Sequence, residues 1–221
     1  MIRTIIVGLF QTNCYLLPIT KNEVIVIDAG AEGEKIAEVL KSENLSLSAI
    51  FCTHGHLDHI GGISPLLKAL GSPQDSIPIF AAKKDSAAFG ENAHSYHQKS
   101  FGAMGLPAGY FESFYNPIPK ITTPLEGGEF LSDYGIQVIA TPGHTPGGLC
   151  FLHEKSNSLF VGDTLFSQGI GRTDLLGGDE EELKNSIIQI LSKEDKNLTI
   201  FSGHGSSTSL GQAIDFARYF F

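Results

Sequence analysis

Four short apolar runs in this 221-residue chain each end in a turn that carries histidine or aspartate. In chain order, the turns hold the cluster Thr53–His59, then His144, Asp163 and His204. Short runs rich in β-branched and aliphatic residues favour buried strands. Open sheets usually place their functional sites at the carboxyl ends of strands. The pattern therefore favours a fold that presents several potential ligands at strand ends.

The first turn, His54-Gly55-His56-Leu57-Asp58-His59, has the spacing of a metal site. In an extended segment the side chains of His54 and His56 point the same way, so they can hold one ion from one side. Asp58 and His59 lie past the turn and are aimed at a second ion. Imidazole and carboxylate ligands suit Zn²⁺, and iron or manganese less selectively. We therefore expect this turn to bind two divalent metal ions.

The later turns complete this set. A single histidine in a glycine turn is more often structural, but a two-metal site needs more ligands than the first turn supplies. Three ligands for each ion and one bridging carboxylate make seven: His54, His56, Asp58, His59, His144, Asp163 and His204. His94 and His97 are predicted to be surface or rim histidines, and His153 to be solvated.

Strands and helices are interspersed in both halves of the chain. The predicted strands are Ile2–Val7, Cys14–Leu17, Val24–Ile27, Ala49–Cys52, Ile136–Ala140, Leu149–Leu152, Ser158–Val161 and Leu198–Phe201. Apolar positions at helical spacing predict helices over Glu34–Glu43, Ile63–Leu70 and Leu183–Leu191, the last preceded by Asp179. Two sheets back to back with helices outside satisfy this order in a single domain, 1–221. The aromatic, glycine-rich stretch at about 86–117 is predicted to be an extended excursion near the site, with room for one helix.

Composition excludes several classes of partner. Fifteen basic against 24 acidic residues give a formal net charge of −9, which disfavours binding to nucleic acid or to an anionic membrane surface. No apolar stretch is long enough to span a bilayer. Cys14, Cys52 and Cys150 are too few and too scattered for a disulfide framework, so we expect buried, reduced thiols and a cytoplasmic protein.

These motifs resemble those of the metallo-β-lactamase superfamily, and within it the short glyoxalase II-like hydrolases. The resemblance covers Gln11–Leu16, Asp28–Gly30, Thr53–His59, Thr141–Gly147, Gly162–Gly178 and Gly203–Gly211. It implies an α+β fold, a four-layer αββα sandwich with a dinuclear site. By this resemblance His54, His56 and His144 hold the first ion, Asp58, His59 and His204 hold the second, and Asp163 bridges them. Asp28 would orient the histidine loop without binding metal.

The resemblance also implies a reaction. Two ions that share a water lower its pKa, and the bridging hydroxide attacks a thioester carbonyl, with Asp58 as a candidate acceptor for the water's proton. S-lactoylglutathione, or a related 2-hydroxyacyl thiol ester, is the expected small-molecule substrate. Arg172 matches the basic residue that contacts the glutathione backbone in glyoxalase II. Its alternative role is structural, in a pair with Asp174 or another acidic residue.

A second reaction class shares several of these motifs. Glutathione persulfide dioxygenases have a similar Gly-x-Gly-Arg-Thr-Asp stretch and bind one iron through residues that match His54, His144 and Asp163. The Gly203-His204-Gly205 sequence here favours the hydrolase, because the dioxygenases usually have Ala-His-Asp-Tyr at that point. β-Lactamase activity is less expected, since true lactamases usually have cysteine or serine where Asp163 stands. A binding module that kept the fold is the third interpretation.

Overall fold

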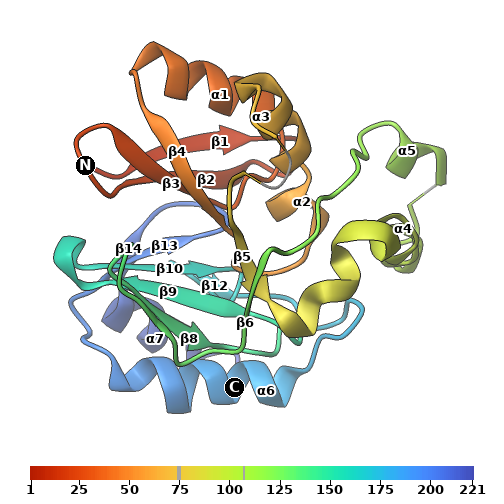
Figure 1. Ribbon diagram of the computed structural model, residues 1–221. Helices are drawn as coiled ribbons and strands as arrows, with labels where there is room; N and C mark the ends of the chain where they lie inside the picture. Colours follow the sequence, from red (N-terminus) through yellow and green to blue (C-terminus); the bar gives the residue numbers. More distant parts are fainter. Residues whose placement is uncertain (74–75, 107) are drawn as a thin grey trace. The chain divides into compact units, whose positions relative to one another are not determined.

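The computed structural model describes residues 1–73, 76–106 and 108–221, and the chain divides into two compact units, Met1–Pro124 and Leu125–Phe221 (Figure 1). The second unit contains a six-stranded sheet, and the first contains five strands of another together with part of its sixth. Helices pack on both sheets. The expected arrangement of 1–221 as a single domain stays a prediction.

The first unit is built on a mixed sheet in the order β1-β2-β3-β4-β5, followed by β6 at the boundary between the units. The strands are β1 (Arg3–Val7), β2 (Thr12–Pro18), β3 (Glu23–Ile27), β4 (Ser46–Phe51), β5 (Ile79–Ala82) and β6 (Thr123–Leu125). β1, β2 and β3 pair antiparallel, whereas β3, β4 and β5 run parallel. Parallel neighbours need a crossover connection, and α1 (Gly33–Ser42) supplies it between β3 and β4.

Helices α1 and α3 (Ile63–Leu70) lie side by side over this sheet (Figure 1). Ile36 and Leu40 of α1 and Leu66 of α3 are completely buried in one apolar cluster with the sheet. The predicted helices over Glu34–Glu43 and Ile63–Leu70 are therefore confirmed. A short helix, α2 (Leu57–Ile60), directly follows the histidine turn.

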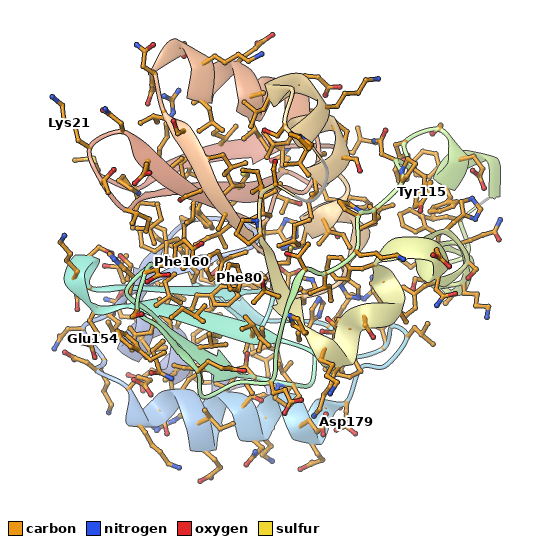
Figure 2. All side chains as sticks on the ribbon, in the orientation of Figure 1. Lys21, Phe80, Tyr115, Glu154, Phe160 and Asp179 are labelled. Carbon is orange, nitrogen blue, oxygen red and sulfur yellow. The ribbon has the colours of Figure 1, made fainter. Side chains whose placement is uncertain are left out.

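The stretch at about 86–117 contains two α-helices, where the sequence indicated room for one. They are α4 (Ala93–Ala103) and α5 (Ala108–Glu112), preceded by 3₁₀ turns at Lys83–Ala88 and Gly90–Asn92. Aromatic rings hold them together instead of a regular apolar stripe: Phe111 lies 5.4 Å from Phe101 and 5.0 Å from Tyr115 between ring centroids. Tyr115 lies just beyond α5 (Figure 2).

The second unit has the strand order β14-β13-β10-β9-β8-β7. Its strands are β7 (Phe130–Leu131), β8 (Ile136–Ala140), β9 (Leu149–His153), β10 (Ser158–Gly162), β13 (Thr199–Ser202) and β14 (Thr208–Ser209). β10 and β13 are parallel, and a separate hairpin pairs β11 (Leu165–Phe166) with β12 (Gly169–Ile170). All eight strands predicted from the sequence are present: Ile136–Ala140 matches at both ends, and the ends of the others differ by at most three residues.

Two helical segments cover one face of this second sheet (Figure 1). The first is α6 (Glu180–Asn185), which continues as a π-helical turn over Ser186–Ile190 and a 3₁₀ turn over Leu191–Lys193; the second is α7 (Leu210–Ala217). Asp179 caps α6, as predicted, because its carboxylate accepts a hydrogen bond from the Glu182 amide (Figure 2). None of the helices in the described part of the chain has the length and apolar character needed to cross a bilayer.

The three cysteines are buried and unpaired, as expected. Burial raises the pKa of the Cys150 thiol to about 12 and raises those of Cys14 and Cys52 as well. These thiols are therefore neutral, unreactive parts of the two cores.

Candidate metal-ligand clusters

The first cluster lies on the turn between β4 and α2 in the first unit. β4 ends at Phe51, and the extended backbone of His56 leads into α2, which carries Asp58 and His59. The ring centroid of His54 is 4.8 Å from that of His56 and 4.1 Å from that of His59. The structure thus brings together the three imidazoles that the spacing singled out.

Asp28 holds this turn in place from the end of β3. Its Oδ1 accepts a hydrogen bond from the Thr53 amide at 2.8 Å, and its Oδ2 accepts from Thr53 Oγ1 at 2.7 Å and from His59 Nδ1 at 2.9 Å. Asp28 has a φ of 57°, in the left-handed region, which aspartate tolerates better than most residues. Asp28 therefore contacts the loop as expected of a residue that orients it.

These contacts determine the tautomers of two histidines. A carboxylate only accepts, so His59 must carry its proton on Nδ1. The Thr53 hydroxyl donates its proton to Asp28, so its oxygen accepts from His54 Nδ1, 3.1 Å away. In both rings Nε2 then carries the lone pair, which is the form of imidazole that ligates metal.

Asp58 is the carboxylate of this cluster. Its Oδ2 lies 3.7 Å from His59 Nε2, which is too long for a hydrogen bond. Two ligands of one tetrahedral Zn²⁺, each with a bond of about 2.0–2.1 Å, lie roughly 3.3 Å apart. The separation is therefore close to that of two ligands of one ion. Thr12 Oγ1 donates to the same oxygen at 3.3 Å.

Asp85 is a buried residue of this cluster that the sequence did not reveal. Its Oδ2 accepts a hydrogen bond from the Gly55 amide at 2.8 Å, at the centre of the His54–His56 turn. A Cβ on Gly55 would lie 2.8 Å from the Ala88 side chain, so the turn fits closely against this segment. Asp85 comes from the 3₁₀ turn after β5, 30 residues away, and no local motif marks it.

We expect Asp85→Ala to weaken zinc binding by about 10- to 100-fold, the usual effect of removing a group that orients metal ligands. The Gly55 amide loses its acceptor, so the spacing of His54 and His56 is no longer fixed. Competition with a chelator of known affinity measures the effect. Asp133→Ala, at an exposed carboxylate, is the control, and equal zinc affinity of both variants would contradict the role given to Asp85.

The second cluster lies within the second unit and contains His144, Asp163 and His204. Asp163 Oδ2 is 3.7 Å from His144 Nε2 and 3.5 Å from His204 Nε2. His144 Nδ1 donates to the Arg172 carbonyl at 2.7 Å, and because a carbonyl only accepts, Nε2 again carries the lone pair. One carboxylate oxygen thus lies at ligand spacing from two imidazoles.

Backbone packing explains the glycines around this cluster. Asp163 follows β10, where Gly162 adopts a φ of 49°. A Cβ on Gly171 would lie 1.9 Å from the Asp163 carbonyl oxygen and 3.1 Å from His144 Nδ1. Only glycine fits at position 171, which accounts for the second glycine of the Gly-x-Gly-Arg stretch independently of any ligand. The donor sets of both clusters, imidazole with carboxylate, fit divalent metal ions.

Arg172 forms an ion pair with Asp174. Its Nε donates to Asp174 Oδ1 at 2.7 Å, and its terminal nitrogen donates to Oδ2 at 2.8 Å. This two-point contact lowers the pKa of Asp174 to about 2, so the pair is intact at neutral pH. The guanidinium is about half exposed. The structure therefore shows the structural pairing that the sequence left open, at a place where solutes can also reach the guanidinium.

The other histidines correct two expectations. His94 is exposed and its Nε2 lies 2.9 Å from Glu112 Oε1, as a surface histidine. His97 is buried, not at the rim: its Nε2 donates to the Ala88 carbonyl, and burial lowers its pKa to about 4. His153 is also buried rather than solvated, with Nδ1 2.7 Å from Ser156 Oγ. The short turn after β9 folds back and covers it.

Comparisons with known proteins identify the family of this chain. A model of the metallo-β-lactamase superfamily matches residues 7–204. The hydroxyacylglutathione hydrolase GloC of Haemophilus influenzae is 32% identical over 211 residues, covering 96% of this chain and 93% of that protein.

Two solved structures have a similar fold over nearly the full length of both chains. BLEG-1, a B3 metallo-β-lactamase, is 32% identical with a TM-score of 0.83, covering 99% of each chain. TTHA1623, solved in a di-iron-bound form, is 30% identical with a TM-score of 0.79, covering 98% of this chain and 99% of that one. The fold class predicted from the sequence is confirmed by these matches.

Proposed function

Because this chain belongs to the metallo-β-lactamase superfamily, we propose that it is a dinuclear metal-dependent hydrolase that cleaves a thioester. The observation that carries the proposal is the form of the histidines. His54, His59 and His144 each use Nδ1–H in a hydrogen bond, which leaves the lone pair on Nε2. Imidazoles held in this way are built to ligate metal, and a carboxylate lies at ligand spacing in each cluster.

The proposal keeps the seven ligands expected from the sequence. His54, His56 and His144 would hold one ion, Asp58, His59 and His204 would hold the other, and Asp163 would be shared between them. Bound divalent ions, Zn²⁺ in our proposal with iron or manganese as alternatives, polarise a carbonyl and lower the pKa of a water. The relative TTHA1623, which holds two irons, supports the number of ions and leaves their identity open.

The other roles of the chain's residues are to hold the ligands in position and to accept a proton. Asp28 fixes the His59 ring, and Asp85 fixes the backbone between His54 and His56. Asp58 is the proposed acceptor for the proton of the attacking water, since its carboxylate is partly exposed and Thr12 orients it. A thiolate is a good leaving group and needs no strong acid. A thioester is therefore the substrate class whose cleavage does not depend on a general acid among these residues.

S-lactoylglutathione, or a related 2-hydroxyacyl thiol ester, is the proposed substrate, and the likeness to GloC supports it. The test compares two reactions in the same preparations. Zinc-loaded protein should hydrolyse S-lactoylglutathione without oxygen, because hydrolysis involves no redox change. Iron-loaded protein should take up no oxygen with glutathione persulfide. Persulfide-dependent oxygen uptake by the iron form, with no thioesterase activity in any metal form, would instead establish the dioxygenase.

Substitutions of Arg172 and Asp174 test whether the guanidinium binds substrate, because they should change KM in opposite directions. If the guanidinium anchors a substrate carboxylate, Asp174 competes with that substrate. Arg172→Ala should then raise KM for an anionic thiol ester by about 10- to 100-fold, the loss of a charge-assisted hydrogen bond, while Asp174→Ala should lower it. Steady-state kinetics with anionic and neutral thioesters measures both. Similar losses with either substrate in both variants would make the pair purely structural.

A β-lactam is the second candidate substrate, favoured by the likeness to the B3 metallo-β-lactamase BLEG-1. We rank it below the thioester because of the carboxylate at Asp163. Nitrocefin hydrolysis, measured beside S-lactoylglutathione hydrolysis with the same zinc protein, decides between them. A higher kcat/KM for nitrocefin would reverse the order.

We also propose that the enzyme acts in the cytoplasm on a small molecule, without a nucleic acid or membrane partner. The three reduced, buried cysteines support this location, since disulfides are rare there. The net charge of −9 supports the absence of an anionic partner.

A further inference from the structure

A cavity of about 280 Å³ lies beside Asp58 within the first unit. Most of its wall is apolar: Val7 at the end of β1, Leu57 at the start of α2, Phe101 of α4 and Phe114 beyond α5. The helical excursion after β5 therefore forms one side of this cavity. The turn between β1 and β2 forms another, and it carries two exposed apolar side chains, Leu9 and Phe10.

Asp58 and Thr12 are the polar residues at one part of this wall. Asp58 is a proposed ligand and proton acceptor, so this part of the cavity adjoins the place where a substrate carbonyl would react. A substrate that reacts beside Asp58 can extend one of its two arms into the cavity. The apolar residues beyond Asp58 decide which arm fits.

The described lining residues offer no positive charge to the thiol arm of most biological thioesters. Among the described residues that line the cavity there is no lysine, arginine or histidine, whereas Asp58 and Glu32 both contribute carboxylates. Glu32 is fixed in place, since its Oε2 accepts from the Gly8 amide at 2.8 Å. Glutathione and coenzyme A carry carboxylates or phosphates, which would enter this lining without a cationic partner, at a cost in desolvation. An uncharged arm fits this environment.

The volume sets the size of that arm. An apolar cavity of about 150 Å³ can hold benzene, which has six carbons. A cavity nearly twice as large accepts an acyl chain of roughly six to eight carbons and leaves most of its space unfilled by a lactoyl group.

We propose that this cavity is the acyl-binding site of the enzyme and that it selects thioesters of medium-length, uncharged acyl groups. The inference rests on the proposed thioesterase function and favours acyl groups longer than lactoyl as its substrates. Each methylene that leaves water for the cavity should raise kcat/KM by about fourfold, or roughly 15-fold from butanoyl to hexanoyl.

The kinetic test uses acetyl, butanoyl, hexanoyl and octanoyl esters of N-acetylcysteamine, so that only the acyl group changes. Ala31→Phe fills the cavity from a partly exposed position in its wall and should remove most of the gain in kcat/KM with chain length. Ala69→Phe, at an equally partly buried alanine of the same core that does not line the cavity, should keep the gain. Asn116→Trp, at an exposed position in the wall, is a second filling variant in case Ala31→Phe does not fold.

A charged acyl group gives a second arm of the test. Succinyl and 4-methylpentanoyl esters have nearly the same shape, and the enzyme should prefer the uncharged one by at least about tenfold. Glu32→Gln keeps an acceptor for the Gly8 amide and should narrow that preference. Equal rates for the two esters in the wild-type protein would overturn the proposal.

The two possible failures are distinguishable. If acetyl, hexanoyl and octanoyl esters are hydrolysed equally well, the proposal of an acyl-binding site is wrong, whereas the proposed thioesterase activity is supported. If no thioester is hydrolysed in any metal form, the thioesterase is wrong, and binding alone tests the cavity. 2-Octanone should then shift the NMR signals of the Val7 and Leu57 methyl groups and should bind with a lower Kd than butanone. Ala31→Phe should abolish the shift. No preference for 2-octanone would overturn the acyl site.

Discussion

Asp163→Ala should lower kcat/KM for the thioester by at least about a hundredfold, with the fold intact. Removing a residue that merely orients a ligand already costs about 10- to 100-fold, and Asp163 is proposed as a ligand itself. Its Oδ2 lies at ligand spacing from both His144 and His204, so one substitution disturbs two imidazoles. Steady-state kinetics on zinc-saturated protein measures the loss, and circular dichroism checks the fold.

Asp133→Ala is the matched control, because it removes an exposed carboxylate from the turn between β7 and β8 of the same unit. Its kcat/KM should equal that of the wild type. Near-native turnover of Asp163→Ala would show that this carboxylate does not belong to the catalytic centre, and the proposed bridge would be abandoned.

Gly30→Ala should destabilise the protein by about 3 kcal/mol or more, the upper range for forcing an atom into packed structure. A Cβ at Gly30 would lie 1.7 Å from the backbone oxygen of Asp58 and 3.4 Å from the Cα of His59. These are backbone atoms, so the substitution moves the segment that carries two proposed ligands. For a chain of this size we expect the Tm to fall by roughly 6–12 °C.

Gly102→Ala is the comparison variant. Gly102 lies in α4, and a Cβ added there would meet no atom within 4 Å. It should raise the stability by about 0.5–1 kcal/mol, since alanine is the better helix former. Differential scanning calorimetry of metal-free protein separates both effects from metal binding. If Gly30→Ala has the same Tm as the wild type, the close contact between Gly30 and the Asp58 backbone is incorrect.

Local signals account for the parts of the fold that the sequence predicted. The eight strands were marked by apolar runs, and the helix at Leu183 by its spacing and by Asp179. The sequence also held a signal for α7 that was overlooked. Leu210, Ala213, Ile214 and Ala217 are buried at helical spacing, and Ser209 caps the helix, but two small residues made the apolar stripe weak.

Other features depend on contacts between distant residues. β5 is four residues long and has no local pattern that separates it from a loop, because its strand partner β4 lies 29 residues away in the sequence. The helices at about 86–117 are held by aromatic contacts, which have no fixed period along the chain. His97 is buried by the same cluster of helices, so its environment was not visible locally.

The candidate ligands were predictable because each follows a strand and glycines surround them. The residues that support them were predictable only in part. Asp28 belonged to a known motif, and the structure shows its hydrogen bonds to Thr53 and His59. Asp85 has no motif, and its contact with Gly55 appears only in the folded chain.

The number of metal ions tests the central claim most directly. Metal-free protein is saturated with Zn²⁺, freed of excess and analysed by inductively coupled plasma mass spectrometry. Seven ligands with a bridging carboxylate predict about two ions per chain, and His59→Ala should reduce the number to about one. Saturation of the wild type at a single ion, with no loss in His59→Ala, would contradict a dinuclear centre.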